Sequence, residues 1–409
     1  MNERHDIVII GGGQAGLAMS YLLRQRGREH VILERRRLAE RWYSQRWDSL
    51  CFQFPKWSLQ LPGYGYTGND PDGFAPRDAV SRFIEDYARF IDAPVRCNAE
   101  VRALEHEAAS GRFLLETGDA LIEADSIVIA TGPYQRPSIP LASAALPPDV
   151  FQIHACDYHN AEQLPPGAIL IVGAGGSGCQ IAEELSLHGR TIYLSAGRHR
   201  IAPRRYRGRD LLWWLLAMGR MDITIESLPD RKPLPPLMLT GVDGGHDINL
   251  RHLAAVGVHV LGSFHGMDGD KLLFLDNLGA IFDAADKSLE DFMGAAESYR
   301  QATGLELPED INQAFGEART PLMLGTSRAL DWRADNVRTV IWCTGYRGSF
   351  DWVHLPVFDA QGMPRQRRGV TDCRGAYFLG LNWMHKQKSS TLFGVGEDAA
   401  YLADVITAT

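Results

Sequence analysis

The sequence predicts an α/β protein with two Rossmann-like dinucleotide-binding domains, one inserted into the other. A glycine-rich turn follows an apolar, β-branched run twice, at residues 11–16 and 173–178. A further apolar run ends in a Thr-Gly turn in each half of the chain, at residues 131–132 and 344–345. A strand, a glycine turn and a helix in this order are typical of the unit that binds a nucleotide diphosphate at the helix N-terminus.

The first turn has the spacing G-x-G-x-x-G and lies between an apolar run at residues 6–10 and an amphipathic segment at residues 17–26. We expect Gly11 to permit the tight turn and Gly13 to let the backbone approach a pyrophosphate. Gly16 is expected to let the helix pack closely on the strand. The next strand then ends in an acid, Glu34, whose carboxylate should reach a ribose 2′-hydroxyl.

The second turn repeats this pattern but is followed by different residues. An apolar run at residues 168–172 leads into it, and the next strand, residues 191–194, is followed by Ser195 and Arg198 instead of an acid. A hydroxyl and a guanidinium can hydrogen-bond a 2′-phosphate that a carboxylate would repel. The second site is therefore expected to prefer NADPH to NADH, while a solvated surface role for Arg198 stays open as the alternative.

Two nucleotide-binding units imply two nucleotides, and the unit with the acid is expected to hold FAD. We expect residues 1–140 and 350–409 to form an FAD-binding domain. Residues 150–346 are expected to form an NADPH-binding domain with a helical insertion around residues 200–330. The proline-rich stretch at residues 133–148 marks the first boundary between them.

Composition and charge exclude several classes of protein. The chain has 409 residues and a formal net charge of −8, which argues against a nucleic-acid-binding or membrane-surface protein. Six arginines between residues 198 and 209 are interpreted as a funnel for cofactor phosphates. No apolar run approaches the length of a membrane span, and the first strand begins too early to leave room for a signal peptide, so a cytoplasmic protein is expected.

The six cysteines lie far apart, and none forms a C-x-x-C pair. This spacing is typical of neither a disulfide scaffold nor a zinc site. It also lacks the redox-active dithiol that a disulfide reductase with two nucleotide folds requires. Electrons from a reduced flavin are therefore expected to pass to oxygen or to an organic acceptor.

Three other segments are interpreted as neighbours of the cofactors. Trp42 and Trp47 lie in an aromatic loop that is expected to cover a planar ligand, with packing into the core as an equal alternative. The C-terminal glycine turn and helix, residues 391–401, are expected to return to the first domain and stabilise negative charge on a reduced flavin. Residues 200–236, which include the apolar helix at residues 211–218, are interpreted as an insertion able to lie over a cleft, with a plain buried helix as the preferred alternative.

Several histidines and lysines outside the two turns carry side chains that could take part in chemistry. His246 and His252 suggest a metal site or an acid–base pair, but no second group of ligands stands at a suitable spacing. We therefore expect a surface or substrate-cleft loop there and no metal site. His385, Lys386 and Lys388 precede the last glycine turn and are expected to face either the flavin edge or solvent.

On these residues the chain resembles the class B flavoprotein monooxygenases, which include the flavin-containing monooxygenases and the plant YUCCA enzymes. Within that family it is most similar to bacterial flavoproteins labelled as potassium-transport proteins. The resemblance covers nearly the whole chain. It rests on both glycine turns and on four further segments, residues 47–56, 130–133, 343–346 and 394–400.

The chain departs from the family pattern in its fingerprint F-x-G-x-x-x-H-x-x-x-W/Y. Only His154 and Tyr158 remain of this motif, because Pro148 and Val150 occupy the Phe and Gly positions. These departures bear on how long an oxygenated flavin would survive. They keep open an NADPH oxidase or dehydrogenase-type flavoenzyme without oxygen insertion, beside a redox-sensing flavoprotein that regulates transport.

The resemblance implies an FAD-dependent, NADPH-reduced monooxygenase that forms a flavin hydroperoxide and oxygenates a small organic substrate. It implies that Gln53, which stands where the animal enzymes carry Asn, is the flavin-facing catalytic group. Gly176 stands where Asn or Gln is usual beside the NADP diphosphate. The expected partners are a small-molecule substrate and molecular oxygen, with no nucleic acid or membrane partner and with a homodimer as one permitted assembly.

The residues expected to contact the two cofactors combine both turns, the strand ends and the family positions. They are Gly11, Gly13, Gln14, Ala15, Gly16, Glu34, Arg35, Trp42, Trp47, Val101, Thr131, Gly132, Gly173, Gly175, Gly176, Ser177, Gly178, Ser195, Arg198, Thr344, Gly345, Tyr346, Leu392 and Gly394.

Overall fold

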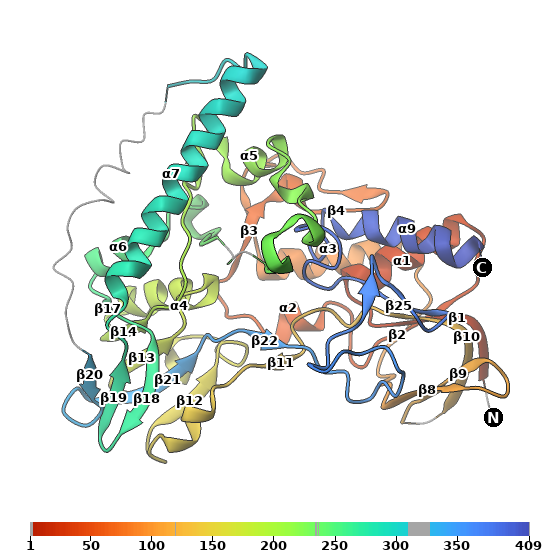
Figure 1. Cartoon of the computed structure of the whole chain (residues 1–409), viewed down its shortest axis with the longest axis horizontal. Helices are drawn as coiled ribbons and strands as arrows, with labels where there is room; N and C mark the ends of the chain where they lie inside the picture. Colours follow the sequence, from red (N-terminus) through yellow and green to blue (C-terminus); the bar gives the residue numbers. More distant parts are fainter. Residues whose placement is uncertain (1–2, 119, 234, 236, 310–327, 409) are drawn as a thin grey trace.

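The computed structural model describes residues 3–118, 120–233, 235, 237–309 and 328–408. Part of the expected helical insertion, residues 310–327, therefore lies outside the described residues, as do residues 234 and 236. The described chain is a mixed α/β fold with two separate large sheets (Figure 1), which confirms the predicted α/β class.

The first sheet is built from both ends of the chain. Its strands are β1 (Glu3–Ile10), β2 (Val31–Leu33), β7 (Val95–Arg96), β8 (Ala103–Glu107), β9 (Arg112–Glu116), β10 (Leu121–Ile129), β23 (Gln366–Arg367), β24 (Val370–Thr371) and β25 (Ala376–Phe378). The order is β23-β24-β25-β10-β1-β2-β7, and β8 and β9 extend from β10 as an antiparallel hairpin. The central strands from β25 to β7 run parallel. The second half of β1 is buried throughout because this parallel sheet is covered on both faces.

Helices from distant parts of the chain cover one face of the first sheet. They are α1 (Gln14–Gln25), α3 (Arg77–Phe90) and α9 (Val395–Ala408), and their apolar side chains share one core cluster with the sheet. Between α1 and α3 in sequence lie, besides β2, the elements α2 (Glu40–Ser44), β3 (Cys51–Pro55), β4 (Gln60–Leu61), β5 (Tyr64–Gly65) and β6 (Phe74–Pro76). The β8–β9 hairpin and residues 350–358 pack on the other face. The C-terminal strand and helix thus return to the N-terminal sheet, and both ends of the chain lie at the same end of the molecule (Figure 1).

The second sheet is parallel throughout. It contains β12 (Phe151–His154), β13 (Ala168–Val172), β14 (Ile192–Ser195), β17 (His259–Leu261) and β21 (Val337–Trp342), in the order β12-β21-β13-β14-β17. Helices α4 (Gly176–Leu187), α6 (Leu250–Ala255) and α7 (Leu278–Thr303) contribute to the core on one face. The antiparallel strands β18 (Phe264–Asp268), β19 (Lys271–Phe274) and β20 (Ala329–Asp331) contribute to the core on the other.

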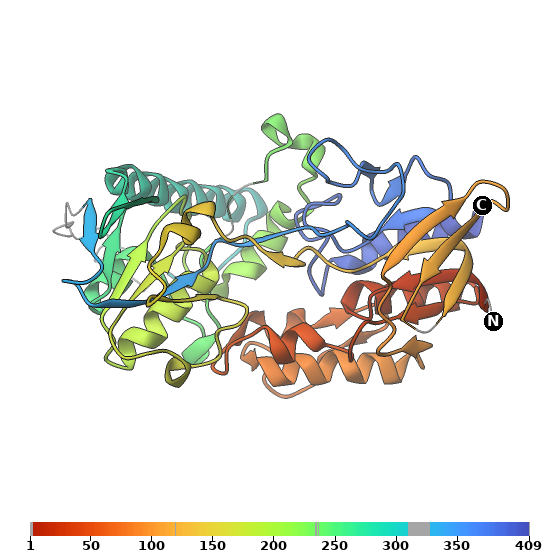
Figure 2. The same cartoon turned by 90° about the horizontal axis from the view of Figure 1, so that it is seen from below.

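A short antiparallel pair joins the two sheets. β11 (Arg136–Pro137) carries the chain out of the first sheet, and β22 (Tyr346–Arg347) carries it back beside the same point. Figure 2 shows these two connections crossing between the halves side by side.

The segment after β14 packs against side chains from β3 and from the chain just before α9. It contains β15 (Arg205–Tyr206), β16 (Arg209–Asp210) and α5 (Leu211–Ala217). Leu211, Leu212 and Leu215 of α5 are buried in a cluster that includes Phe54 of β3 and Phe393 near α9. The interpretation of residues 211–218 as a plain buried helix is therefore confirmed for its apolar face. Over the described residues, no helix combines the length and apolar character that crossing a bilayer requires.

Candidate nucleotide-binding sites

The first glycine turn is shaped by steric contact at one end and open space at the other. A Cβ atom at Gly16 would lie 1.9 Å from the carbonyl oxygen of Gly11, so only glycine allows α1 to begin this close to β1. Gly13 is the N-cap of α1, has no side-chain cap, and would place a Cβ atom with nothing within 4 Å. The uncapped N–H groups and the open space in front of them fit a bound pyrophosphate.

Glu34 follows β2 at the edge of the sheet where the first turn lies. Its Oε2 accepts a hydrogen bond from the backbone N–H of Gly12 at 2.8 Å, and its Oε1 accepts one from the N–H of Arg36 at 3.0 Å. These bonds hold the carboxylate beside the turn, in the position from which an acid binds a ribose hydroxyl. Arg35 is exposed next to it.

Two other segments lie against this turn. Thr131 and Gly132 follow β10, and the side chain of Gln135 donates to the Thr131 Oγ1 at 2.7 Å and to the Gly132 carbonyl at 3.0 Å. From the C-terminal part, the Ser390 carbonyl accepts a hydrogen bond from Gln14 Nε2 at 3.2 Å. A Cβ atom at Gly380 would lie 2.6 Å from the Cβ atom of Ala15.

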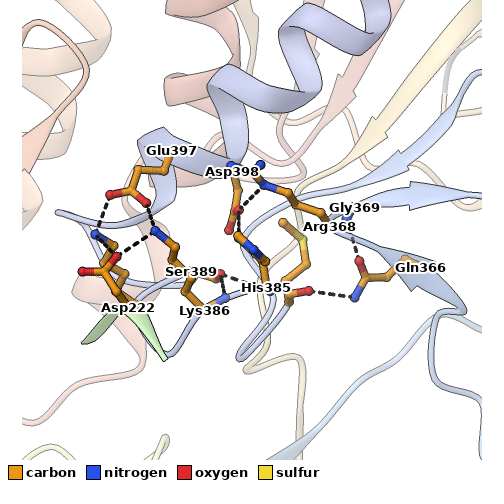
Figure 3. A network of polar contacts seen from close by, with 11 residues as sticks. Asp222, Gln366, Arg368, Gly369, His385, Lys386, Ser389, Glu397 and Asp398 are labelled. Carbon is orange, nitrogen blue, oxygen red and sulfur yellow. Dashed lines mark hydrogen bonds and ion pairs between the residues drawn. The ribbon is translucent and has the colours of Figure 1, made fainter. Parts of the chain in front are cut away.

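The C-terminal segment is held by a network of ion pairs (Figure 3). Lys386 Nζ lies 2.7 Å from Asp222 Oδ1 and 2.8 Å from Glu397 Oε2, and Lys388 pairs with the same two carboxylates. Burial opposes ionisation of Glu397, but hydrogen bonds from the two lysines still lower its pKa. Both lysines thus join the insertion to α9 and are not freely solvated, while the expectation that they face the flavin edge stays a prediction.

The rest of this segment is packed inside the protein. The Leu392 side chain is 5% exposed in the core, and a Cβ atom at Gly394 would lie 2.1 Å from the Lys388 carbonyl oxygen. At the start of α9, Asp398 Oδ1 lies 3.4 Å from His385 Nδ1 and 3.5 Å from Arg368 Nε. Leu392 and Gly394 thus shape the segment that lies beside the first turn.

The second glycine turn repeats the geometry of the first. A Cβ atom at Gly178 would lie 1.8 Å from the Gly173 carbonyl oxygen. Gly175 is the N-cap of α4, again without a side-chain cap and with nothing within 4 Å of a Cβ atom. At Gly176 the nearest atom to a Cβ would be 3.9 Å away, and Ser177 is exposed. This helix start also fits a diphosphate.

Ser195 does not present its hydroxyl to a ligand. The residue is 2% exposed, and its Oγ donates to the Gly262 carbonyl at 2.9 Å and accepts from the Phe264 N–H at 2.8 Å. The hydroxyl therefore joins β14 to the start of β18. The expectation that Ser195 binds a 2′-phosphate is therefore wrong, because both hydrogen bonds of its hydroxyl go to the backbone. Arg198, three residues after the same strand, is exposed.

His199 is a neighbour of the second turn that sequence reasoning missed. It is 3% exposed, neither ring nitrogen has a hydrogen-bond partner among the described residues, and the ring lies by the backbone of Ala174 in the turn. Burial lowers its pKa to about 4, so the ring is neutral at neutral pH. An orphaned imidazole beside an uncapped helix start fits a site that a polar ligand completes. No motif marks this histidine in the sequence.

The aromatic loop after α2 is divided between a core and a surface. Trp47 is 4% exposed inside the core of the second sheet, so the alternative of core packing is right and a cover over a ligand is wrong for this residue. Trp42 is half-buried, edge-on to Phe52 with ring centroids 6.0 Å apart. Gln53 is exposed on β3, and its carbonyl accepts a hydrogen bond from Arg204 Nη1 at 2.7 Å. Val101 is half-buried on the far face of the first sheet, beside the core that the β8–β9 hairpin shares.

The remnants of the family fingerprint fasten the connection between the sheets. His154 Nδ1 accepts from the Cys156 N–H at 3.2 Å, which leaves Nε2 to donate to the Gly345 carbonyl at 3.1 Å. Burial lowers the pKa of His154, in keeping with this neutral tautomer. The Thr344 hydroxyl donates to the Ser138 carbonyl, and the Tyr346 ring packs on His154 with centroids 5.0 Å apart.

All six cysteines are free thiols. Cys179 and Cys343 approach each other beneath the second turn, but burial raises the pKa of Cys179 to about 12 and that of Cys343 still further. Protonated, buried thiols are poor nucleophiles, so this pair is not the dithiol of a disulfide reductase.

Comparison with known proteins places the chain in a class. A family profile described as pyridine nucleotide-disulphide oxidoreductase matches residues 8–213. The chain belongs to this family, within the class B flavoprotein monooxygenase group that the sequence motifs indicated.

The relatives reported below are named as oxidoreductases or monooxygenases. The Geobacillus kaustophilus protein named uncharacterized oxidoreductase CzcO-like is 32% identical over 405 residues, covering 98% of each chain. The rice indole-3-pyruvate monooxygenase YUCCA1 is 27% identical over 302 residues, covering 68% of this chain and 74% of that protein. A flavin-containing monooxygenase from Stenotrophomonas maltophilia has the same fold, with a TM-score of 0.68, 21% identity and 99% coverage of both chains.

Proposed function

We propose that this protein is an FAD-dependent, NADPH-reduced monooxygenase for a small organic substrate. The observation that carries the proposal is the pair of matched glycine turns, each at an uncapped helix start with open space in front of it. FAD binds at the first turn, where Glu34 is held beside Gly12, and NADPH binds at the second, where Arg198 is exposed and His199 lacks a partner.

When bound, FAD supplies hydride acceptance from NADPH and electron transfer to oxygen, chemistry that no side chain provides. The chain supplies binding and orientation. The N–H groups of α1 and α4 hold the two diphosphates, and Glu34 orients the ribose of the first nucleotide. The absence of a reactive dithiol among the six cysteines supports oxygen, and not a disulfide, as the acceptor. The name of the YUCCA relative supports oxygen insertion.

Gln53 remains the proposed flavin-facing polar group. The Gln53 side chain is exposed on β3. The guanidinium of Arg204, which belongs to the insertion, donates a hydrogen bond to the Gln53 carbonyl and so fixes the backbone that carries this side chain. We expect Gln53→Ala to increase the fraction of NADPH oxidation that ends in peroxide, and Gln53→Asn to retain more of the wild-type ratio because Asn keeps the amide. Equal peroxide fractions in both variants and the wild type would remove Gln53 from the site.

The proposed reaction is tested by NADPH-dependent oxygen uptake against amines, sulfides, ketones and indolic acids, with peroxide measured in the same samples. The proposal expects at least one class to lower the peroxide yield and to incorporate an atom from ¹⁸O₂. Stoichiometric peroxide with every compound would support the second candidate, an NADPH oxidase. The loss of Phe and Gly from the fingerprint at Pro148 and Val150 is the observation that favours that candidate.

A further inference from the structure

Three side chains that the nucleotide sites do not use meet beside the C-terminal half of α4. Glu183 lies on α4, His246 lies in the loop before α6, and His252 lies on α6. Glu183 Oε1 is 2.8 Å from His246 Nε2 and 2.8 Å from His252 Nε2. The three potential ligand atoms all lie within 4.8 Å of one another. Glu183 lies more than sixty residues before the two histidines in the sequence, so only the fold brings the three side chains together.

The donor set and its surroundings fit a borderline-soft divalent cation. Two imidazole nitrogens and one carboxylate are ligands that Zn²⁺ takes in open sites, where water fills the fourth position. The His246 Nδ1 lies 3.3 Å from the Val242 carbonyl, the kind of contact that turns Nε2 of a ligating histidine toward the metal. The Glu183 side chain is 11% exposed, whereas those of His246 and His252 are 31% and 37% exposed, so a cation can enter from solvent.

We propose that Glu183, His246 and His252 bind one divalent transition-metal ion, with Zn²⁺ as the best match and water as the remaining ligand. The ion fastens the loop that carries Asp247 to α4. Asp247 Oδ1 accepts a hydrogen bond from the Arg204 N–H, and Arg204 in turn donates to the Gln53 carbonyl. The metal site thus strengthens a chain of contacts from the helix that starts at the second turn to β3 of the first half.

The proposal is tested by calorimetric titration of chelator-treated full-length protein with Zn²⁺. The wild type is expected to bind one equivalent and to show a higher unfolding temperature in zinc, since a ligand that binds only the folded state stabilises it. Glu183→Gln, His246→Ala and His252→Ala should each weaken binding by about tenfold or more, which corresponds to the loss of about 1.4 kcal/mol. The matched control is His354→Ala, which removes a surface histidine 3.3 Å from Glu105 and should leave zinc binding unchanged.

The outcomes separate a metal site from a plain ion-pair cluster. No zinc binding by the wild type, or equal binding by all three variants and the wild type, would overturn the proposal. If a histidine variant fails to fold, the wild type still decides the matter. Co²⁺ should then give the intense visible absorption of a four-coordinate site, and a weak, octahedral spectrum would contradict it.

Discussion

Ser195, Arg198 and His199 show how differently neighbouring residues behave at the end of one strand. The Ser195 hydroxyl makes two hydrogen bonds to the backbone, and the Arg198 guanidinium is exposed. The His199 imidazole is buried and has no hydrogen-bond partner among the described residues. The sequence suggested a phosphate-binding role for the first two, on residue type and position. It could not separate them, because burial of Ser195 depends on Gly262 and Phe264, which lie more than sixty residues later.

Arg198→Ala tests which of these residues selects the cofactor. A charge-assisted hydrogen bond contributes about 1.5–3 kcal/mol, so the KM for NADPH should rise by about tenfold or more. The KM for NADH, which has no 2′-phosphate, should change little. Steady-state kinetics with both nucleotides measure this, and Arg102→Ala, an exposed arginine of the first half, is the control. Equal effects on the two KM values would show that Arg198 does not contact the phosphate.

His199 gives the nucleotide-free protein a defined acid sensitivity. Its pKa is lowered from 6.5 to about 4 by burial, so between these values the unfolded chain binds a proton that the folded chain does not. The contribution of the neutral His199 ring to the free energy of unfolding is therefore fully present above pH 6.5 and is lost as the pH falls toward 4. The shift corresponds to about 3 kcal/mol.

Urea unfolding of the wild type and His199→Gln at pH 7.5 and pH 5 measures this effect. The variant should lose less stability than the wild type between the two pH values. Parallel losses in both proteins would show that other groups cause the acid sensitivity.

At the scale of elements, the two strand–turn–helix units were predictable because their determinants are local. Gly11 to Gly16 and Gly173 to Gly178 combine a tight turn with a helix–strand contact that excludes a Cβ atom, and sequence spacing records both constraints. The aromatic loop was less predictable. From the sequence, Trp47 could equally cover a ligand or fill a core. In the structure it packs into the core of the second sheet, whose strands come from distant parts of the sequence.

The open glycines offer a clean test of these helix starts. A Cβ atom at Gly13 or Gly175 meets no protein atom within 4 Å, so Gly13→Ala and Gly175→Ala should fold normally. Each methyl group would occupy space in front of the helix, where the proposed diphosphate site lies. We expect affinity for FAD to fall by about tenfold or more in the first variant, and affinity for NADPH to fall similarly in the second.

Gly294→Ala is the matched control for these variants. Gly294 lies in α7 with equal space around it, and alanine there should stabilise the helix by up to about 1 kcal/mol without affecting either cofactor. Flavin fluorescence and nucleotide titration measure the affinities. Unchanged FAD binding by Gly13→Ala would remove the first turn from the proposed site.

The whole molecule is held together by contacts between segments that are far apart in sequence. The insertion meets the C-terminal part through Asp222 and the two lysines, and through backbone hydrogen bonds from Ile225 to His385 at 2.9 Å and from Gln387 to Ile223 at 3.0 Å. The sequence indicated that the chain returns to its first sheet. It did not indicate the ion-pair network of Asp222 and Glu397 with Lys386 and Lys388, which we call the clasp. Isolated lysines and acids in a sequence do not show which of them form ion pairs.

Asp222→Asn tests the clasp between insertion and α9. Lys388 is 8% exposed, so removing one of its two carboxylates leaves a buried charge half-compensated, at a cost of about 1–3 kcal/mol. The unfolding midpoint should fall, and limited proteolysis near residues 221–225 should accelerate. Asp230→Asn, which breaks an exposed pair 3.7 Å from Lys232 in the same insertion, should change neither. Identical behaviour of the two variants would contradict a stabilising role for the clasp.

The proposed function requires the first glycine turn to hold FAD and the second to hold the NADPH that reduces it. Anaerobic titration of the FAD-loaded protein with NADPH, followed by the visible absorbance of the flavin, measures this reduction. One equivalent of NADPH is expected to bleach the flavin, and Gly175→Ala is expected to require a much higher NADPH concentration for the same bleaching. A flavin that stays oxidised at saturating NADPH would contradict it.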